Sequence, residues 1–256
     1  MGHVQTELKA DVLRITIDRP EKKNALTTAM YTALADAVEE GDSNSDVRVM
    51  LLHSNGDSFT AGNDLEDFMK NPWQGGAMPP ALRFIGAVAN AKKPIIAAVH
   101  GMAVGIGVTI LLHCDLVYAA DTARLTTPFV NLGIVPEAGS TLLLPALVGH
   151  QRAAELLMLG TPISARRAYE LGLVNAVVAP GALLATALEA AQKLAEKPAG
   201  AIRATKTLLR KAGQAELERA IREEVEVLSE RLASPECREA LTAFLEKRKP
   251  NFAQFR

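Results

Sequence analysis

One glutamate stands in a loop rich in glycine and proline. Glu137 lies within residues 133–140, between apolar residues and directly before an apolar segment at 141–148 that we expect to be helical. A carboxylate withdrawn from water has its pKa raised toward that of an effective general base. A glutamate at this place can also serve a helix N-terminus, where its charge suits the helix dipole. The residues by themselves leave both interpretations open.

Two further loops carry glycine beside small residues. Residues 59–65 (Phe-Thr-Ala-Gly-Asn-Asp-Leu) follow a predicted strand, and residues 100–107 (His-Gly-Met-Ala-Val-Gly-Ile-Gly) follow a buried strand and lead into a helix. Backbone N–H groups in such loops can bind an anion or a developing oxyanion. An ordinary turn with Asp64 as a helix cap, or close packing of a helix on a strand, explains them equally well. The second loop lacks Gly-x-Gly-x-x-Gly spacing, so a dinucleotide site is disfavoured.

Composition excludes several classes of protein. The 256 residues contain 28 Lys+Arg against 29 Asp+Glu, a formal net charge of −1, which argues against nucleic-acid and membrane-surface partners. The two cysteines lie far apart and the five histidines are scattered, so neither a disulfide framework nor a metal site is expected. No apolar run is long enough for a membrane helix, the N-terminus shows no signal core, and the chain does not end in Ser-Lys-Leu. We therefore expect a cytoplasmic protein.

Strands and helices alternate in the first part of the chain, and helices dominate the rest. Alternating or continuous apolar runs predict strands at 13–17, 47–52, 94–99, 115–120, 123–129 and 173–179. Helical periodicity predicts helices at 24–40 with Thr27 as a cap, at 81–91 and at 141–148 capped by Ser140. Further helices are expected at 150–159, 164–171, 181–196, 198–211, 214–233 and 235–248. The fold class is therefore α/β with a helical C-terminal region.

The loops, taken in order, resemble the crotonase (enoyl-CoA hydratase/isomerase) superfamily over essentially the whole chain. The resemblance rests on residues 19–26, 61–65, 94–107, 114–115, 129–133, 160–165 and 244–250. It implies a spiral of ββα units over residues 1–195 that holds a coenzyme A thioester site, and a helical region over 196–256 that builds trimers, often paired into hexamers. The acyl-CoA is then the substrate, and no separate cofactor is implied.

The resemblance also implies which residues form the site. The backbone N–H groups of Ala61 and Ile106 are the expected oxyanion hole for the thioester carbonyl. The walls of the coenzyme A site are expected to come from residues 22–26 and 61–65, with phosphate contacts from Lys23 and Lys247. The expected substrate-binding residues are Lys23, Ala25, Leu26, Gly62, Asn63, Asp64, Leu65, Gly105 and Lys247. An acyl pocket formed by Met69, Trp73, Met78 and Leu82 is a weaker expectation, because such a stripe is often plain packing.

The sequence departs from the hydratases of the family in its acids. Their two glutamates would fall at Thr109 and Phe129, and neither side chain can replace a carboxylate in acid–base work. The single Glu137 is similar to the catalytic glutamate of the Δ3,Δ2-enoyl-CoA isomerase branch. One carboxylate suffices to move a double bond from C3 to C2, because it can take a proton from the α-carbon and return one to C4.

We therefore predict such an isomerase, in fatty-acid or related acyl-CoA metabolism. The alternatives are a hydratase or another crotonase-type reaction, using Glu137 alone or with Asp64, and a non-catalytic acyl-CoA-binding subunit.

Overall fold

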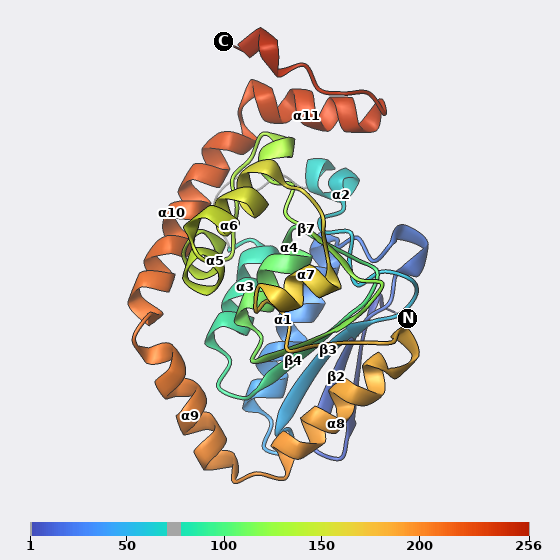
Figure 1. Ribbon diagram of the computed structural model, residues 1–256, viewed down its shortest axis with the longest axis vertical. Helices are drawn as coiled ribbons and strands as arrows, with labels where there is room; N and C mark the ends of the chain where they lie inside the picture. The colour runs from blue at the N-terminus through green and yellow to red at the C-terminus, as the bar shows by residue number, and fades with distance from the viewer. Residues whose placement is uncertain (1, 71–77, 256) are drawn as a thin grey trace.

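The strands form two sheets in the computed structural model, which describes residues 2–70 and 78–255 (Figure 1). Within these residues the larger sheet has six strands in the order β1-β2-β3-β4-β6-β9. The strand β1 runs antiparallel to β2, and the other neighbours are parallel. The smaller sheet has the order β5-β7-β8. The strands are β1 (Val4–Lys9), β2 (Val12–Ile17), β3 (Val49–Ser54), β4 (Ile95–Val99), β5 (Met102–Val104), β6 (Leu116–Ala120), β7 (Arg124–Thr126), β8 (Ile163–Ser164) and β9 (Ala176–Val178).

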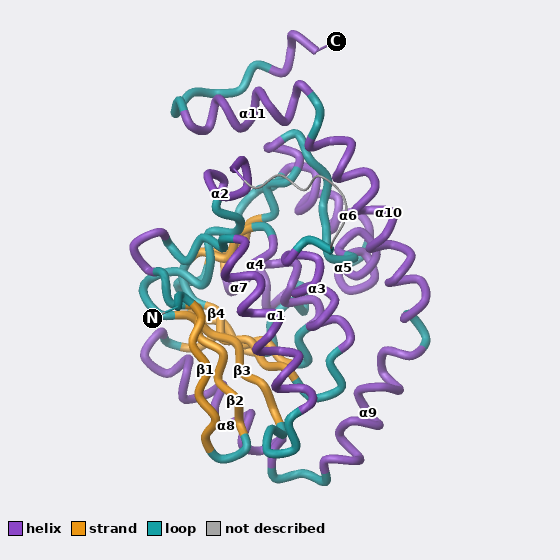
Figure 2. The backbone as a smooth tube through the Cα atoms, turned by 180° about the vertical axis from the view of Figure 1, so that it is seen from behind, coloured by secondary structure: helices purple, strands orange, loops and turns teal. Residues whose placement is uncertain are grey.

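Helices cover both faces of the larger sheet, which explains why its central strands are apolar throughout. Successive side chains of a strand point to opposite faces. On β3, Val49 and Leu51 pack against α8 (Leu183–Ala195), whereas Met50 and Leu52 pack in the main core with α1 (Thr28–Ser43) and α3 (Pro80–Asn90). The view from behind shows the same layers, with α1 on one side of the strands and α8 on the other (Figure 2).

The helix α1 begins at its predicted cap, and the remaining helices of the core are shorter than α1. As predicted, the side chain of Thr27 caps α1 by accepting a hydrogen bond from the backbone N–H of Met30. The other α-helices of the core are α2 (Leu65–Lys70), α4 (Ile106–Thr109), α5 (Ser140–Val148), α6 (His150–Ala154) and α7 (Ala165–Glu170). The 3-10 turns are η1 (Pro20–Lys22), η2 (Ile110–His113), η3 (Val130–Leu132), η5 (Pro180–Ala182) and η6 (Phe252–Phe255), and η4 (Glu155–Leu159) is a π-helical turn.

The C-terminal helices run along one side of the core and across one end (Figure 1). They are α9 (Ala199–Lys211), α10 (Gln214–Leu232) and α11 (Pro235–Leu245). Two cations of α9 attach it to the core: Lys206 Nζ donates to an Asp115 carboxylate oxygen at 2.7 Å, and an Arg210 guanidinium nitrogen donates to the His113 carbonyl at 2.5 Å. The predicted α/β class with a helical C-terminal region is therefore confirmed. The division into units at residue 196 stays a prediction.

Several elements differ from the sequence-based expectation. The pattern did not indicate β1, because five of its six residues are exposed and apolar side chains do not alternate along it. Ser140 is not the cap of α5: Gly139 occupies that position, and Ser140 is the first helical residue. The segment 100–107 leads into the short α4 as predicted, but it also contains the strand β5, which the pattern did not indicate. The strand β8 was missed since it has only two residues.

Candidate active site

A cavity of about 670 Å³ opens where the two glycine loops, the 133–140 loop and the C-terminal helices meet. The core supplies the backbone of 61–66 and 104–106 together with side chains of α1 and α3. The helices α10 and α11 supply a mostly apolar wall. The core loops and the C-terminal helices therefore build this site together.

Glu137 is half-buried and lines this cavity. The Thr109 hydroxyl donates to its Oε1 at 2.5 Å. Burial raises the pKa of the Glu137 carboxyl to about 7, the Thr109 hydrogen bond opposes that rise, and the charge of Glu224 adds to it. A carboxyl group with a pKa near neutrality can both accept and return a proton at physiological pH. The sequence-based prediction of a desolvated carboxylate at this position is confirmed.

The backbone around Glu137 is held in an uncommon shape. The next residue, Ala138, has a left-handed φ of 62°, which costs a non-glycine residue energy unless its surroundings impose it. The buried His113 ring provides one restraint, because its Nε2 lies 2.7 Å from the Ala138 carbonyl and must carry the proton that this carbonyl accepts. Burial lowers the pKa of His113 to about 4, so the ring is a neutral structural donor at pH 7.

The structure corrects one of the two expected oxyanion-hole donors, the backbone N–H of Ala61. The backbone N–H of Ala61 already donates to the Lys23 carbonyl at 2.9 Å, so it is not free for a substrate. Two residues on, the N–H of Asn63 has no acceptor within the described part of the chain, and Asn63 lines the cavity. The Gly62 carbonyl and the Asp64 N–H both bond Leu26, so the N–H of Asn63 between them points to the opposite side, that of the 104–106 loop.

The second expected donor agrees with the structure. Ile106 is the first residue of α4, where an N–H has no partner within the helix. Its N–H has no acceptor among the described residues, and Ile106 lines the cavity beside Gly105. Gly105 has a φ of +56°, a conformation that glycine adopts without strain. The candidate oxyanion donors are therefore the backbone N–H groups of Asn63 and Ile106.

The expected substrate-binding residues divide into two groups. Ala25, Gly62, Asn63, Asp64, Leu65 and Gly105 line the cavity, whereas Lys23, Leu26 and Lys247 do not. Leu26 is buried in the core, and Lys23 forms an ion pair with Asp57. The cavity is lined instead by Lys22, next to Lys23, and by Arg248, which is next to Lys247 and pairs with Glu239 and Glu246. One-residue differences of this kind depend on turn geometry, which composition does not reveal.

Asp64 is unsuited to acid–base chemistry. Its Oδ2 accepts from the Arg19 guanidinium at 2.6 Å, and its Oδ1 accepts from the backbone N–H of Asp67 in α2 at 3.0 Å. Burial alone would raise its pKa, but these bonds outweigh burial and hold the pKa of Asp64 below its usual value. The carboxylate is therefore committed to the fold, as the helix-cap interpretation predicted.

Apolar side chains also line the cavity, among them Leu82 and Ile85 of α3 and Leu228 and Leu241 of the C-terminal helices. Of the residues expected in an acyl pocket, Leu82 lines the cavity. Met69 and Met78 are exposed and do not line the cavity, and Trp73 lies outside the described residues.

Sequence reasoning missed Tyr31. This buried residue of α1 lines the cavity, and its hydroxyl donates to the Asn63 side-chain oxygen. Burial, and next the charge of Glu137, raise the pKa of Tyr31 well above 10, so the phenol stays neutral. In the sequence it is one more position of an amphipathic helix. Phe129, which stands where a hydratase has a glutamate, also lines the cavity.

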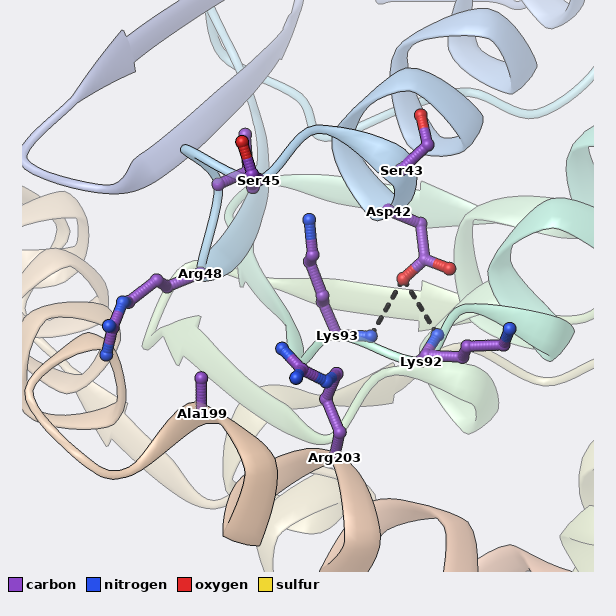
Figure 3. Close-up of a pocket in the computed structure, with 9 residues that line it drawn as sticks. Asp42, Ser43, Ser45, Arg48, Lys92, Lys93, Ala199 and Arg203 are labelled. Atoms are coloured by element: carbon purple, nitrogen blue, oxygen red, sulfur yellow. Dashed lines mark hydrogen bonds between the residues drawn. The ribbon is translucent and has the colours of Figure 1, made fainter.

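A second hollow, of about 350 Å³, lies at the end of α1 and beside α9 (Figure 3). Two of its four cations bond helix ends: Lys93 Nζ donates to the carbonyls of Gly41 and Asn44, and Arg48 donates to the carbonyls of Ala195 and Lys197. Cations favour the C-terminal ends of helices.

The carboxylate of this second hollow is also committed to structure. Asp42 accepts both backbone N–H groups of Lys92 and Lys93, as the dashed lines show (Figure 3). We therefore assign the chemistry to the first cavity. Within the described residues, no group of three or more His, Cys, Asp or Glu is placed to hold a metal ion. No described helix is long and apolar enough to span a bilayer.

Comparison with known proteins gives one consistent family. The model of the family described as "Enoyl-CoA hydratase/isomerase" matches residues 7–255. The chain is 37% identical to a crotonyl-CoA hydratase of Syntrophomonas wolfei, over 92% of each protein. It is 36% identical to the rat enoyl-CoA delta isomerase 2, over 93% of this chain and 62% of that longer relative. A crystal structure of an enoyl-CoA hydratase/isomerase from Pseudoalteromonas atlantica T6c superposes with a TM-score of 0.94 at 42% identity, covering 98% of this chain and 100% of that one.

Proposed function

The chain belongs to the enoyl-CoA hydratase/isomerase family, whose members process acyl-CoA thioesters, and we propose that its own reaction is the shift of a C3 double bond to C2 in an enoyl-CoA. The observation that carries this proposal is the desolvated carboxyl group of Glu137, with a pKa of about 7, in the same cavity as two backbone N–H groups that have no acceptor among the described residues. The name of the rat relative, a delta isomerase, agrees with it.

The proposed chemistry needs one proton carrier. The Glu137 carboxylate removes a proton from C2 of the 3-enoyl thioester, and the electrons of that C–H bond move into a dienolate. Its negative charge develops on the thioester oxygen, where the N–H groups of Asn63 and Ile106 would donate. The Glu137 carboxylic acid then protonates C4 and becomes a carboxylate again. An oxyanion donor of this kind is worth about 3–4 kcal/mol in a transition state.

Hydration would need more groups than the cavity offers. Addition of water to a 2-enoyl thioester requires a positioned water and transfer of a proton to C2. The other described carboxylates that line the cavity are Asp64, which is bonded to Arg19, and Glu66, which is exposed at its mouth. Thr109 and Phe129 supply no carboxylate. The hydratase among the relatives keeps hydration as the alternative that the assay must exclude.

The test is to incubate the purified protein separately with 3-hexenoyl-CoA and 2-hexenoyl-CoA and to resolve the products by chromatography and mass. We expect a product of unchanged mass from the 3-enoyl substrate and little gain of one water by the 2-enoyl substrate. In the Glu137→Gln variant we expect turnover to fall at least roughly 100-fold, because general acid–base catalysis contributes about that much or more. Rapid hydration by the wild type would refute the isomerase proposal.

Two controls separate catalysis from binding. Glu40→Gln changes an exposed carboxylate at the far end of α1 and should leave turnover unchanged. Calorimetric binding of hexanoyl-CoA to Glu137→Gln should match the wild type, because Gln keeps the shape of the side chain. A wild type that binds hexanoyl-CoA but converts neither enoyl substrate would favour the acyl-CoA-binding subunit.

We also propose a cytoplasmic homotrimer, or a hexamer made of two trimers, that needs no cofactor besides its coenzyme A thioester substrate. Exposed apolar side chains such as Met158 and Leu159, which are 63% and 64% exposed, support burial between subunits. Light scattering on the purified protein would measure the mass of the particle.

A further inference from the structure

The active-site loop depends on a carboxylate that comes from the C-terminal helices. Glu224 of α10 is 6% exposed, and it lies 87 positions after Glu137 in the chain. Its Oε2 accepts from the backbone N–H of Gly139 at 2.6 Å. Its Oε1 accepts from the backbone N–H of Thr141 at 2.9 Å and from the Thr141 hydroxyl at 2.6 Å. All three groups are donors and favour the ionised form of Glu224, whereas burial outweighs them and raises the pKa of its carboxyl above the usual value.

These bonds replace a cap that α5 lacks. The cap position of α5 is Gly139, which has no side chain to bond the first N–H groups of the helix. Glu224 supplies that bonding from another helix, and its negative charge suits the N-terminal end of the α5 dipole. The helices α5 and α10 lie side by side in both views (Figures 1 and 2).

Close packing joins α10 to the same loop. Gly139 has a φ of +70°, and a Cβ atom added there would lie 2.3 Å from the Leu217 side chain of α10. The loop residue next to Ala138 therefore lies directly against this helix. A change in the position of α10 would be transmitted to Glu137 two residues away.

We propose that Glu224 is a positioning residue of the active site, whose carboxylate clamps the Gly139–Thr141 backbone and thereby fixes the place and the electrostatic surroundings of Glu137. The proposal rests on the proposed function in which Glu137 is the proton carrier.

Four described side chains face Glu137 or the loop that carries it, each from a different element. From α1, Tyr31 faces Glu137 as a neutral phenol whose pKa is raised by burial. From η2, the neutral His113 bonds the adjacent carbonyl, and burial lowers its pKa to about 4. From α4, Thr109 donates a hydrogen bond but does not titrate. Glu224, from α10, is the group whose charge raises the pKa of Glu137 beyond the effect of burial.

Two substitutions separate the clamp from the charge. Glu224→Gln keeps the shape but removes the charge and turns an amide NH₂ toward one of the N–H donors. We expect the pKa of Glu137 to fall by roughly half to one unit, since a like charge is removed, and kcat to fall about tenfold as the loop relaxes. Glu224→Asp keeps the charge but shortens the reach, so kcat should fall while the pKa of Glu137 stays close to the wild-type value.

The pKa of Glu137 can be read without turnover. In protein labelled with ¹³C at glutamate carboxyl carbons, the resonance absent from Glu137→Gln identifies Glu137, and its titration gives the pKa. Glu223→Gln is the matched control, because Glu223 is exposed on the same helix and pairs only with Arg219 among the described residues. It should change neither the pKa nor kcat.

An unchanged Glu137 titration in Glu224→Gln would overturn the proposal, whatever happens to kcat. Equal kcat in wild type and Glu224→Asp would also overturn it, because the hydrogen bonds from the loop to Glu224 would then have no effect on turnover. If the wild type isomerises no enoyl-CoA, the proposed function fails, yet the titration of Glu137 still decides whether Glu224 controls it.

Discussion

The hydroxyl of Thr109 should set the pH at which the enzyme becomes active. In Thr109→Val the side chain keeps its volume but cannot donate to Glu137 Oε1, a bond of 2.5 Å in the structure. That bond stabilises the ionised carboxylate, so its removal raises the pKa of Glu137 above the present value of about 7. A hydrogen bond to a charged group contributes about 1.5–3 kcal/mol, which corresponds to roughly one to two pKa units.

The consequence is a loss of activity at pH 7 that is recovered at higher pH. With a pKa of roughly 8 to 9, the ionised fraction of Glu137 at pH 7 falls roughly five- to fifty-fold below that of the wild type. The assay is the pH profile of kcat/KM for 3-hexenoyl-CoA between pH 5 and 10. The rising limb of Thr109→Val should lie about one to two units above that of the wild type, with the plateau largely kept.

The matched control is Thr109→Ser, which keeps the hydroxyl and loses only a methyl group. Its rising limb should coincide with that of the wild type. A limb in Thr109→Val that stays in place or moves to lower pH would show that the hydroxyl does not stabilise the carboxylate. The shift is opposite in sign to the one expected for Glu224→Gln, so the two variants cannot share a trivial cause such as loosened packing.

Three further changes test the fold around the site. The pKa of Glu137 is about 7, against 4.5 for an ordinary glutamate. Its ionisation therefore costs no stability below pH 4.5 but destabilises the fold by about 3 kcal/mol above pH 7. Thermal unfolding should show that Glu137→Gln is more stable than the wild type at pH 8 and equally stable at pH 4. Lys206→Met removes one of the two cations that pair with Asp115, the other being Arg210, and should lower the free energy of urea unfolding by roughly 2 kcal/mol. Gly101→Ala would place Cβ 1.8 Å from the Asp57 carbonyl and should reduce the yield of folded protein sharply.

Two of these changes have a control variant in the same chain. Lys193→Met removes an exposed ion pair with Glu189 and should alter stability by less than about 0.5 kcal/mol. Gly200→Ala adds a methyl group that meets no atom within 4 Å and should be neutral or slightly stabilising in α9. Equal losses in a variant and its control would contradict the structural assignment. For Glu137→Gln, a gain in stability that does not depend on pH would do so.

The sequence by itself determined the α/β architecture and singled out Glu137 as the candidate acid. Apolar runs such as 94–99 predict buried strands because their side chains have no polar face to expose. The helical periodicity after residue 150 predicts the C-terminal helices for the corresponding reason. Glu137 stood out because it lies between apolar residues in a glycine loop, and a desolvated carboxylate has a raised pKa wherever the chain brings it.

The tertiary structure decided which groups meet. Thr109 and Glu224 touch the Glu137 loop from 28 and 85 positions away, and no local pattern reveals such contacts. The identity of the first oxyanion donor also depended on backbone hydrogen bonding. The N–H of Ala61 donates to the Lys23 carbonyl, whereas the N–H of Asn63 has no acceptor among the described residues. Every residue but proline carries one N–H, so composition cannot distinguish these two. Only the direction in which each backbone group points in the folded chain separates a donor already used by the fold from one free for the substrate.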